Sequence, residues 1–241
     1  MKKIILLILI IFIVTTLYPV GFPKLKGRVN DYANILFNDE ERNIEWMLED
    51  LEKKTSAQVV LLTIDTLDGD TIENYSIRLT EQEDWKIGQK GVDNGVILII
   101  SMKERKLRLE VGYGLEGALT DLKSSYIIRK LIVPGFKKGE YYHAILRGLT
   151  TVSGIISKEY DISPEDLKKF KEKKNEKQGF SFITFLIIFF FFVLPAFSKK
   201  RGKGGSIFWG GGGFGGSSSG GFGGFSGGGG SFGGGGASGG W

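Results

Sequence analysis

The stretch from Asp93 to Asp121 restricts the fold of this chain more than any other part of the sequence. Residues 95–102 are continuously apolar and rich in β-branched side chains, which is typical of a strand buried on both faces. Residues 106–111 alternate polar and apolar side chains, which favours a strand with one wetter face. Because Lys103–Arg105 is a polar break of hairpin length, we predict an antiparallel hairpin.

Such a hairpin would bring the residues before Gly95 and those after Val111 to the same end of the sheet. Carboxylates at one strand end, beside glycines that let the backbone approach a ligand, are suited to a divalent cation or a phosphate bound with a metal. The residues expected there are Asp93, Asn94, Gly112, Gly114, Glu116 and Asp121. The alternative is a solvated acidic hairpin end with ordinary turn glycines.

The residues around the hairpin predict four helices and one more strand. Apolar residues at helical spacing predict a helix over Asp39–Lys54, and Gln58–Ile64 is a short β-branched run typical of a buried strand. Further helices are expected over Ile72–Trp85, Leu122–Phe136 and Tyr141–Ile156. This order predicts an α/β fold, with a small mixed β-sheet sandwiched between helices.

Both ends of the chain carry apolar segments. Residues 1–21 have the layout of a signal peptide, with an early basic pair and an 11-residue apolar run; the poor cleavage site leaves an uncleaved anchor as the alternative. Either outcome exports the domain predicted over residues 24–157. A charged linker, 158–179, then precedes residues 180–197, which carry no charge and would be about 27 Å long as a helix. We predict a single transmembrane helix there.

Residues 198–241 comprise a basic flank and a low-complexity tail of Gly, Ser and Phe. Such a composition buries too little apolar surface to offset ordering, so the tail is predicted to be disordered, with self-association through its aromatic residues as one expectation. An exported domain followed by one span predicts a cell-membrane protein with an extracytoplasmic domain and a cytoplasmic tail.

Composition excludes several classes of function. Residues 24–160 carry 20 Lys and Arg against 22 Asp and Glu, so the predicted domain lacks the basic surplus of a nucleic-acid-binding protein. The chain has no cysteine and a single histidine, His143, which removes thiolate catalysis and Cys-based zinc sites. Residues 112–117 match G-x-G-x-x-G, but no later strand completes a βαβ unit and Lys137 lies near the ribose-binding acid position, so we expect no dinucleotide.

Several blocks of sequence resemble the signature of the TPM domain family, in the expected order and spacing. The resemblance covers about Lys24 to Ser157, and the sequence layout is similar to the bacterial YgcG-like, membrane-anchored type. The matching blocks are residues 29–33 (VNDYA), 88–91 (GQKG), 93–96 (DNGV), 110–117 (EVGYGLEG) and 119–121 (LTD).

The resemblance implies an extracytoplasmic α/β sandwich with an acidic cluster at one sheet edge. Among relatives, some bind calcium, some are acid phosphatases, and others are accessory proteins of membrane complexes. By position, the resemblance implies that the metal ligands are Asp31, Asp93, Asn94 and Asp121. We therefore expect a Ca²⁺-binding accessory module of a membrane-associated assembly, with a membrane-protein partner. One alternative is a metal-dependent phosphatase acting on phosphate monoesters at the same site, and another is a partner-binding domain whose carboxylates only cap loops.

Overall fold

The computed structural model describes residues 21–158, 161–171 and 227–241, which belong to two compact units. The first unit contains residues 21–158 and 227–241. The second is described only at 161–171, where a short helix over 164–171 begins with Ser163 Oγ accepting the backbone N–H of Asp166 at 3.1 Å. The predicted signal segment up to residue 20 and the predicted span at 180–197 lie outside the described residues.

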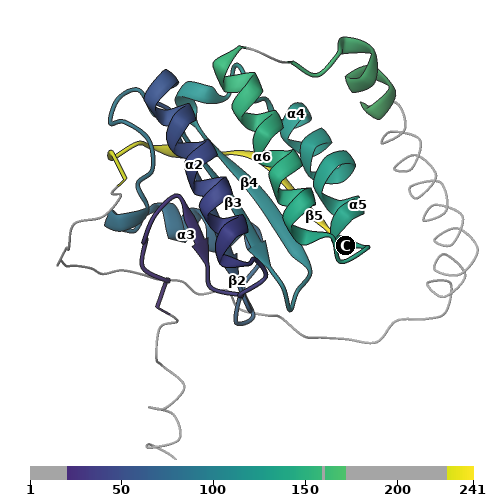
Figure 1. Cartoon of the computed structure of the whole chain (residues 1–241). Coiled ribbons are helices and arrows are strands. Elements are labelled where there is room, and N and C mark those ends of the chain that lie inside the picture. The colour runs from purple at the N-terminus through teal and green to yellow at the C-terminus, as the bar shows by residue number, and fades with distance from the viewer. Residues whose placement is uncertain (1–20, 159–160, 172–226) are drawn as a thin grey trace, which may run out of the picture. The chain divides into compact units, whose positions relative to one another are not determined.

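In the described part of the chain, one mixed sheet has the strand order β1-β2-β3-β4-β5 (Figure 1). The first three strands are parallel to one another, whereas β4 runs antiparallel to both β3 and β5. The strands are β1 (Val29–Asp31), β2 (Gln58–Ile64), β3 (Gly95–Ser101), β4 (Lys106–Gly112) and β5 (Phe232–Gly240).

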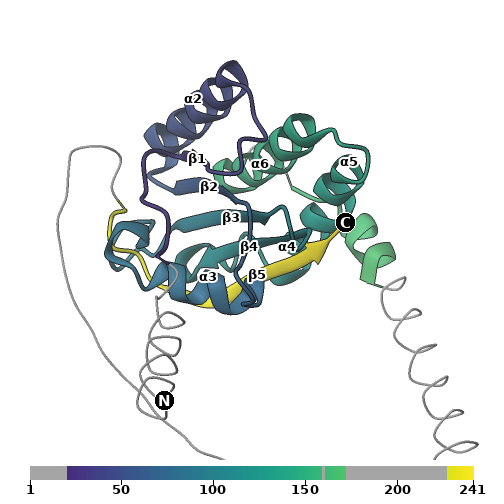
Figure 2. The ribbon, with the colours of Figure 1, turned by 90° about the horizontal axis from the view of Figure 1, so that it is seen from below.

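Helices cover both faces of this sheet, as predicted. Figure 2 shows α2 (Asn38–Thr55) and α6 (Tyr141–Ser157) on one side and α3 (Ile72–Thr80) on the other. Alternate residues of β2 and β3 supply the two halves of the core, because successive side chains of a strand point to opposite faces. On the α3 side, Val60 and Ile97 are fully buried in the same apolar cluster as Ile72, Tyr75 and Leu79.

The predicted hairpin is confirmed. Val96 pairs with Val111 and Ser101 pairs with Lys106 in an antiparallel ladder. The strand predicted over Gln58–Ile64 is also confirmed, with every residue buried. It pairs in parallel with β3 from Gln58↔Gly95 to Ile64↔Ser101.

Two predicted helices are interrupted. The helix expected over 122–136 consists of α4 (Asp121–Tyr126), a π-helical segment (Ile127–Ile132) and α5 (Val133–Phe136). The wide turn precedes Pro134, which has no N–H to continue the helical ladder. The helix expected over 72–85 ends at Thr80, and a 3₁₀ turn at Glu83–Trp85 follows.

The predicted disorder of the tail is wrong for residues 232–240, which form β5. This strand pairs with β4 from Lys106↔Gly240 to Gly112↔Phe232, with an irregularity beside Val111. The composition argument failed because the segment does not need its own core: its backbone completes the hydrogen bonding of an existing sheet edge. Among the described residues, no helix is long and apolar enough to cross a membrane.

Candidate functional site: the β4 edge and its C-terminal strand

The hairpin gathers the loops before β3 and after β4, as the sequence predicted. The N–H of Gly114 donates to the carbonyl of Asp93 at 3.0 Å. A Cβ atom at Gly114 would lie 1.9 Å from the carbonyl oxygen of Val92, so only glycine permits this approach. The backbone of the acidic loop therefore rests directly on the glycine-rich loop.

Two of the predicted metal ligands bind the C-terminal strand. Asp93 Oδ1 accepts the backbone N–H of Ser231 at 2.8 Å, and Asp121 Oδ1 accepts that of Gly236 at 2.7 Å. Each carboxylate comes from a loop or helix start on the main body, and each amide comes from the last 15 residues. The two acids therefore act together on one segment, because Ser231 immediately precedes β5 and Gly236 lies within it.

The other two predicted ligands have separate structural roles. Asn94 is buried, with Oδ1 accepting the N–H of Gln89 at 2.8 Å and Nδ2 donating to the carbonyl of Ser56 at 2.9 Å. Asp31 Oδ2 accepts the N–H of Leu36 at 2.8 Å, and its Oδ1 accepts the hydroxyl of Thr63. Both side chains hold loops around the parallel strands.

Asp31 lies at the opposite end of the sheet from Asp93. Asp31 pairs with Thr63 near the carboxyl end of β2, whereas Asp93 precedes Gly95, the partner of Gln58 at the amino end. Seven strand positions separate these levels by roughly 20 Å. The four predicted ligands therefore do not fit one shared ion, and within the described ranges no group of three or more His, Cys, Asp or Glu residues is placed to hold a metal.

Arg108 holds β5 with its side chain as well as through the ladder. Its Nη1 donates to Ser238 Oγ at 3.1 Å and its Nη2 to the carbonyl of Gly234 at 3.0 Å. Its Nε donates to Glu110 Oε2 at 2.5 Å, and Glu110, which is 0% exposed, also accepts the hydroxyl of Ser76 at 2.9 Å. The buried carboxylate of Glu110 thus orients the guanidinium of Arg108, which donates hydrogen bonds to β5.

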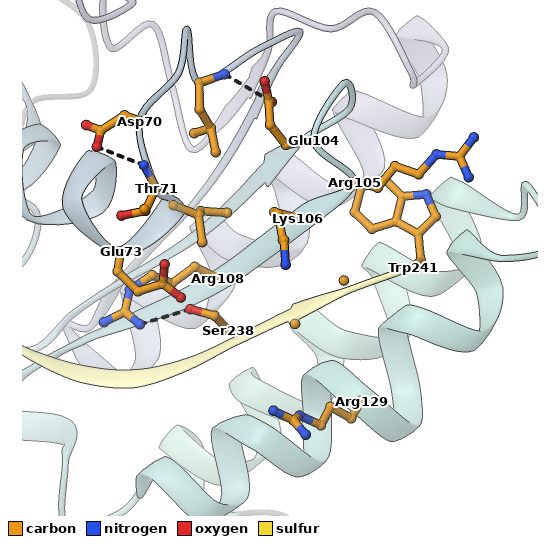
Figure 3. A pocket seen from close by; sticks show the side chains of 14 residues that line it. Asp70, Thr71, Glu73, Glu104, Arg105, Lys106, Arg108, Arg129, Ser238 and Trp241 are labelled. Atoms are coloured by element: carbon orange, nitrogen blue, oxygen red, sulfur yellow. Dashed lines mark hydrogen bonds between the residues drawn. The ribbon is translucent and has the colours of Figure 1, made fainter. Parts of the chain in front are cut away.

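Glu73, at the start of α3, reaches the same serine. Figure 3 shows Glu73 and Arg108 approaching Ser238 from α3 and β4. Partial burial pushes the pKa of Glu73 upward, but the hydrogen bond with Ser238, a bond to its own backbone and the charges of Arg108 and Lys106 outweigh it and lower the pKa. The negative form of Glu73 is therefore the one that suits the docked strand.

The fit between β5 and the main body requires glycine. At Gly236, φ is +119°, and a Cβ atom would lie 1.9 Å from the carbonyl oxygen of Leu109. At Gly239, a Cβ atom would lie 2.4 Å from Cγ2 of Ile128. Glycine at these two positions lets β5 approach the backbone of β4 and the side chain of Ile128 closely.

Aromatic side chains anchor both ends of the strand. Phe232 packs against the apolar cluster on the α3 side. The ring of Trp241 meets that of Phe136 edge-on, with centroids 4.6 Å apart, and the backbone N–H of Trp241 donates to the carbonyl of Arg105. Just before the strand, Gln58 Oε1 accepts the N–H of Gly228 at 3.1 Å.

A pocket of about 1050 Å³ opens beside the end of β5 (Figure 3). Its lining mixes the two signs of charge, so it does not select an anion or a cation by net charge alone. Its cationic residues are Arg105, Lys106, Arg108 and Arg129, and its acidic residues are Asp70, Glu73 and Glu104.

Sequence reasoning missed Gln58, Arg108, Glu110 and Ser238. The alternation Lys106, Arg108, Glu110 along one face of β4 was visible as a polar stripe, but nothing local indicated that a segment over a hundred residues away would cover it. What this arrangement does chemically is to bind backbone amides and carbonyls of an extended, glycine-rich segment, with one serine contacted by side chains.

Three solved structures are similar to the chain to different degrees, and the first of them supports the fold. The N-terminal domain of a P. gingivalis protein, solved by solution NMR, is 27% identical, with a TM-score of 0.51 over 56% of this chain and 84% of that chain. The N-terminal domain of a Corynebacterium glutamicum protein is 12% identical over 60% of this chain and 86% of that chain, with a TM-score of 0.43. The BA42 protein from Bizionia argentinensis is 17% identical over 56% and 90%, with a TM-score of 0.42.

No curated protein matches the chain. The match to a family is clear: the sequence profile of the TPM domain covers residues 29–155, more than half of the chain. The matched range includes β1 to β4 and ends before β5, so β5 lies outside the matched range. The chain belongs to the TPM domain family.

Proposed function

We propose that this protein is an extracytoplasmic, membrane-associated accessory module whose β4 edge binds an extended glycine-rich strand. The observation that carries the proposal is that Asp93 and Asp121, from separate elements, both accept backbone amides of one such segment, at Ser231 just before β5 and at Gly236 within it. In the present structure the chain's own β5 is that strand.

This mode of binding has a simple physical basis. An exposed sheet edge offers a row of unpaired N–H and C=O groups, and an extended segment that pairs with them gains affinity from the backbone and specificity from side-chain pockets. Here the β4–β5 ladder supplies the affinity from the backbone. The specificity comes from the hydrogen bond of Arg108 with Ser238 and from β5 positions where only glycine fits. The site therefore suits a peptide ligand.

The proposal changes one expectation about topology. Pairing of β5 with β4 requires both strands on the same side of any membrane, whereas one crossing by residues 180–197 would separate them. The two arrangements exclude each other for a given molecule. We therefore propose membrane association with the last 15 residues on the domain's side, in place of a cytoplasmic tail.

The test uses the full chain with its own strand disabled by Gly236→Val. A synthetic peptide of residues 227–241, with the natural sequence, is titrated into this variant and into the unaltered protein by calorimetry. Binding to the variant alone is expected, since the natural chain already fills the edge. The matched control is Gly117→Val, because a Cβ at Gly117 meets open space; this control should behave like the natural chain.

A folded Gly236→Val variant, judged by its circular dichroism and NMR dispersion, that takes up no peptide would end the proposal. Should Gly236→Val unfold, Arg108→Lys keeps the positive charge and loses the forked donors that reach Ser238 and Gly234. With that variant, added peptide should compete with the weakened internal strand.

Calcium binding at Asp93 and Asp121 stays a proposal, in which the ion and the strand compete for the same carboxylates. Oxygen ligands suit Ca²⁺, and the strand occupies Oδ1 of each acid. Calorimetric titration of Ca²⁺ into the natural chain and into an Asp93→Ala, Asp121→Ala variant tests it. Equal heats from the two proteins would exclude Ca²⁺ binding at Asp93 and Asp121.

Hydrolysis of phosphate monoesters at the same acidic site, the alternative predicted from the sequence, also stays a prediction. It requires a metal or water held by Asp93 and Asp121 to polarise the ester. Turnover of p-nitrophenyl phosphate that persists in the double variant would show that these residues are not its site.

A further inference from the structure

We infer that the β4 edge of one copy accepts β5 from a second copy, so that neighbouring molecules are joined by strand exchange. The inference rests on the proposed function, because it needs a strand-binding edge. It adds the identity of the partner, which is another molecule of this chain.

The strand behaves as a separable ligand of the main body. Its side-chain and backbone partners all lie between Gln58 and Phe136, and the strand itself lies within residues 227–241. The same contacts therefore form whether the strand comes from the same molecule or from a neighbour.

The length of the connection permits either arrangement. Residues 172–226 number 55 and would extend to at most roughly 190 Å. Because the docked contacts are equivalent, the balance between the two forms depends on local concentration and on the entropy of the connection. A longer connection lowers the effective concentration of the molecule's own strand roughly as the −3/2 power of its length, so exchange requires a high local concentration of copies.

Proposed attachment to a membrane raises that local concentration, because copies confined to a surface meet more often than copies in solution. Every copy carries one β4 edge and one β5 strand. Exchange between two copies closes a symmetric pair, whereas exchange in one direction along successive copies builds an open row.

The experiment exploits the absence of cysteine in the natural chain. Lys106 and Gly240 are paired across β4 and β5. Paired residues of antiparallel strands have Cα atoms about 4.5–5.5 Å apart, which lies within the range that a disulfide bridges. One full-length variant carries Lys106→Cys and another carries Gly240→Cys, each with a different affinity tag, and both are expressed in the same cells.

Mild oxidation of membranes from these cells is expected to give a covalent dimer that carries both tags and disappears on reduction. Adding Gly236→Val to the Gly240→Cys copy should abolish that dimer, because its strand no longer fits. The reference is a single chain with both cysteines, which reports whether the strand docks at all.

The outcomes separate the two proposals. If the doubly substituted chain closes its disulfide internally while the mixed copies give no dimer, strand exchange is wrong and strand binding stands. If the doubly substituted chain forms no disulfide within or between molecules, the strand does not dock on β4, and both proposals fall.

Discussion

Arg108 Nη1 donates a hydrogen bond to Ser238 Oγ at 3.1 Å, which joins residues 130 positions apart in the sequence. The same guanidinium is held by Glu110, a carboxylate with no exposed surface. A buried charge is tolerated only when it is paired and hydrogen-bonded, so this network depends on both of its members. It ties β5 to β4 through side chains as well as through the backbone ladder.

Gly236→Val should release β5 from β4. A β-branched residue strains the positive φ, and its Cβ would overlap the carbonyl of Leu109, so we expect a loss of about 2–4 kcal/mol, limited by the free energy of docking itself. Hydrogen exchange checks this: β4 amides should exchange faster while those of β2 stay protected. Unchanged exchange at β4 would show that the strand tolerates the side chain.

Arg108→Ala should destabilise the fold by about 3–5 kcal/mol, because it leaves Glu110 charged, buried and without its cation. Urea denaturation measures the free energy of unfolding. The double variant Arg108→Met, Glu110→Leu should recover much of the loss, since it removes both charges. A double variant as unstable as the single one would mean that contacts of Arg108 with the strand, and not the orphaned carboxylate, dominate.

Strand docking should weaken in acid. The pKa of Glu73 is lowered in the folded protein relative to its ordinary value of 4.5, so its contribution is present above that value and is lost as the pH falls through the folded pKa. In the Gly236→Val background, affinity for the 227–241 peptide should drop as the pH falls below 4.5. Addition of Glu73→Gln should reduce this pH dependence; an identical profile would exclude Glu73 as its source.

Residues 227–241 should lie on the same side of the membrane as the domain of residues 24–157. Single cysteines at Lys103, in the β3–β4 turn, and at Ser231 both lie at exposed positions. In sealed right-side-out vesicles, an impermeant maleimide should label both variants equally before and after lysis, and the cysteine-free natural chain gives the background. Labelling of Ser231→Cys only after lysis would support a crossing at 180–197 and a tail on the far side.

Local patterns predicted most of the main body correctly. The hairpin of β3 and β4 and the buried strand at 58–64 follow from β-branched runs and one polar break, which act over a few residues. The irregular helix over 121–136 was missed at its π-helical segment, because packing near Pro134 and not periodicity sets the local turn. Family resemblance in the sequence correctly indicated the TPM domain.

The candidate site was only partly accessible to such reasoning. Asp93 and Asp121 were selected as a pair, and the structure brings both to the same strand. Asp31 was grouped with them only through the family resemblance, and the structure places it at the opposite end of the sheet. The segment that Asp93 and Asp121 bind is rich in glycine, and its sequence carries no local sign of strand structure.

By itself, the sequence determined β2, the β3–β4 hairpin and the positions of the main helices, because these depend on side-chain size, polarity and spacing over short distances. It did not predict β1, and the wetter face expected for β4 is wrong, because residues 107–112 are all buried. Only the tertiary structure decided that a glycine-rich segment becomes the fifth strand and that two acids hold it. The physical reason is that β5 has few side chains of its own to bury. Its structure comes from hydrogen bonds to an edge that exists only after the rest of the domain has folded.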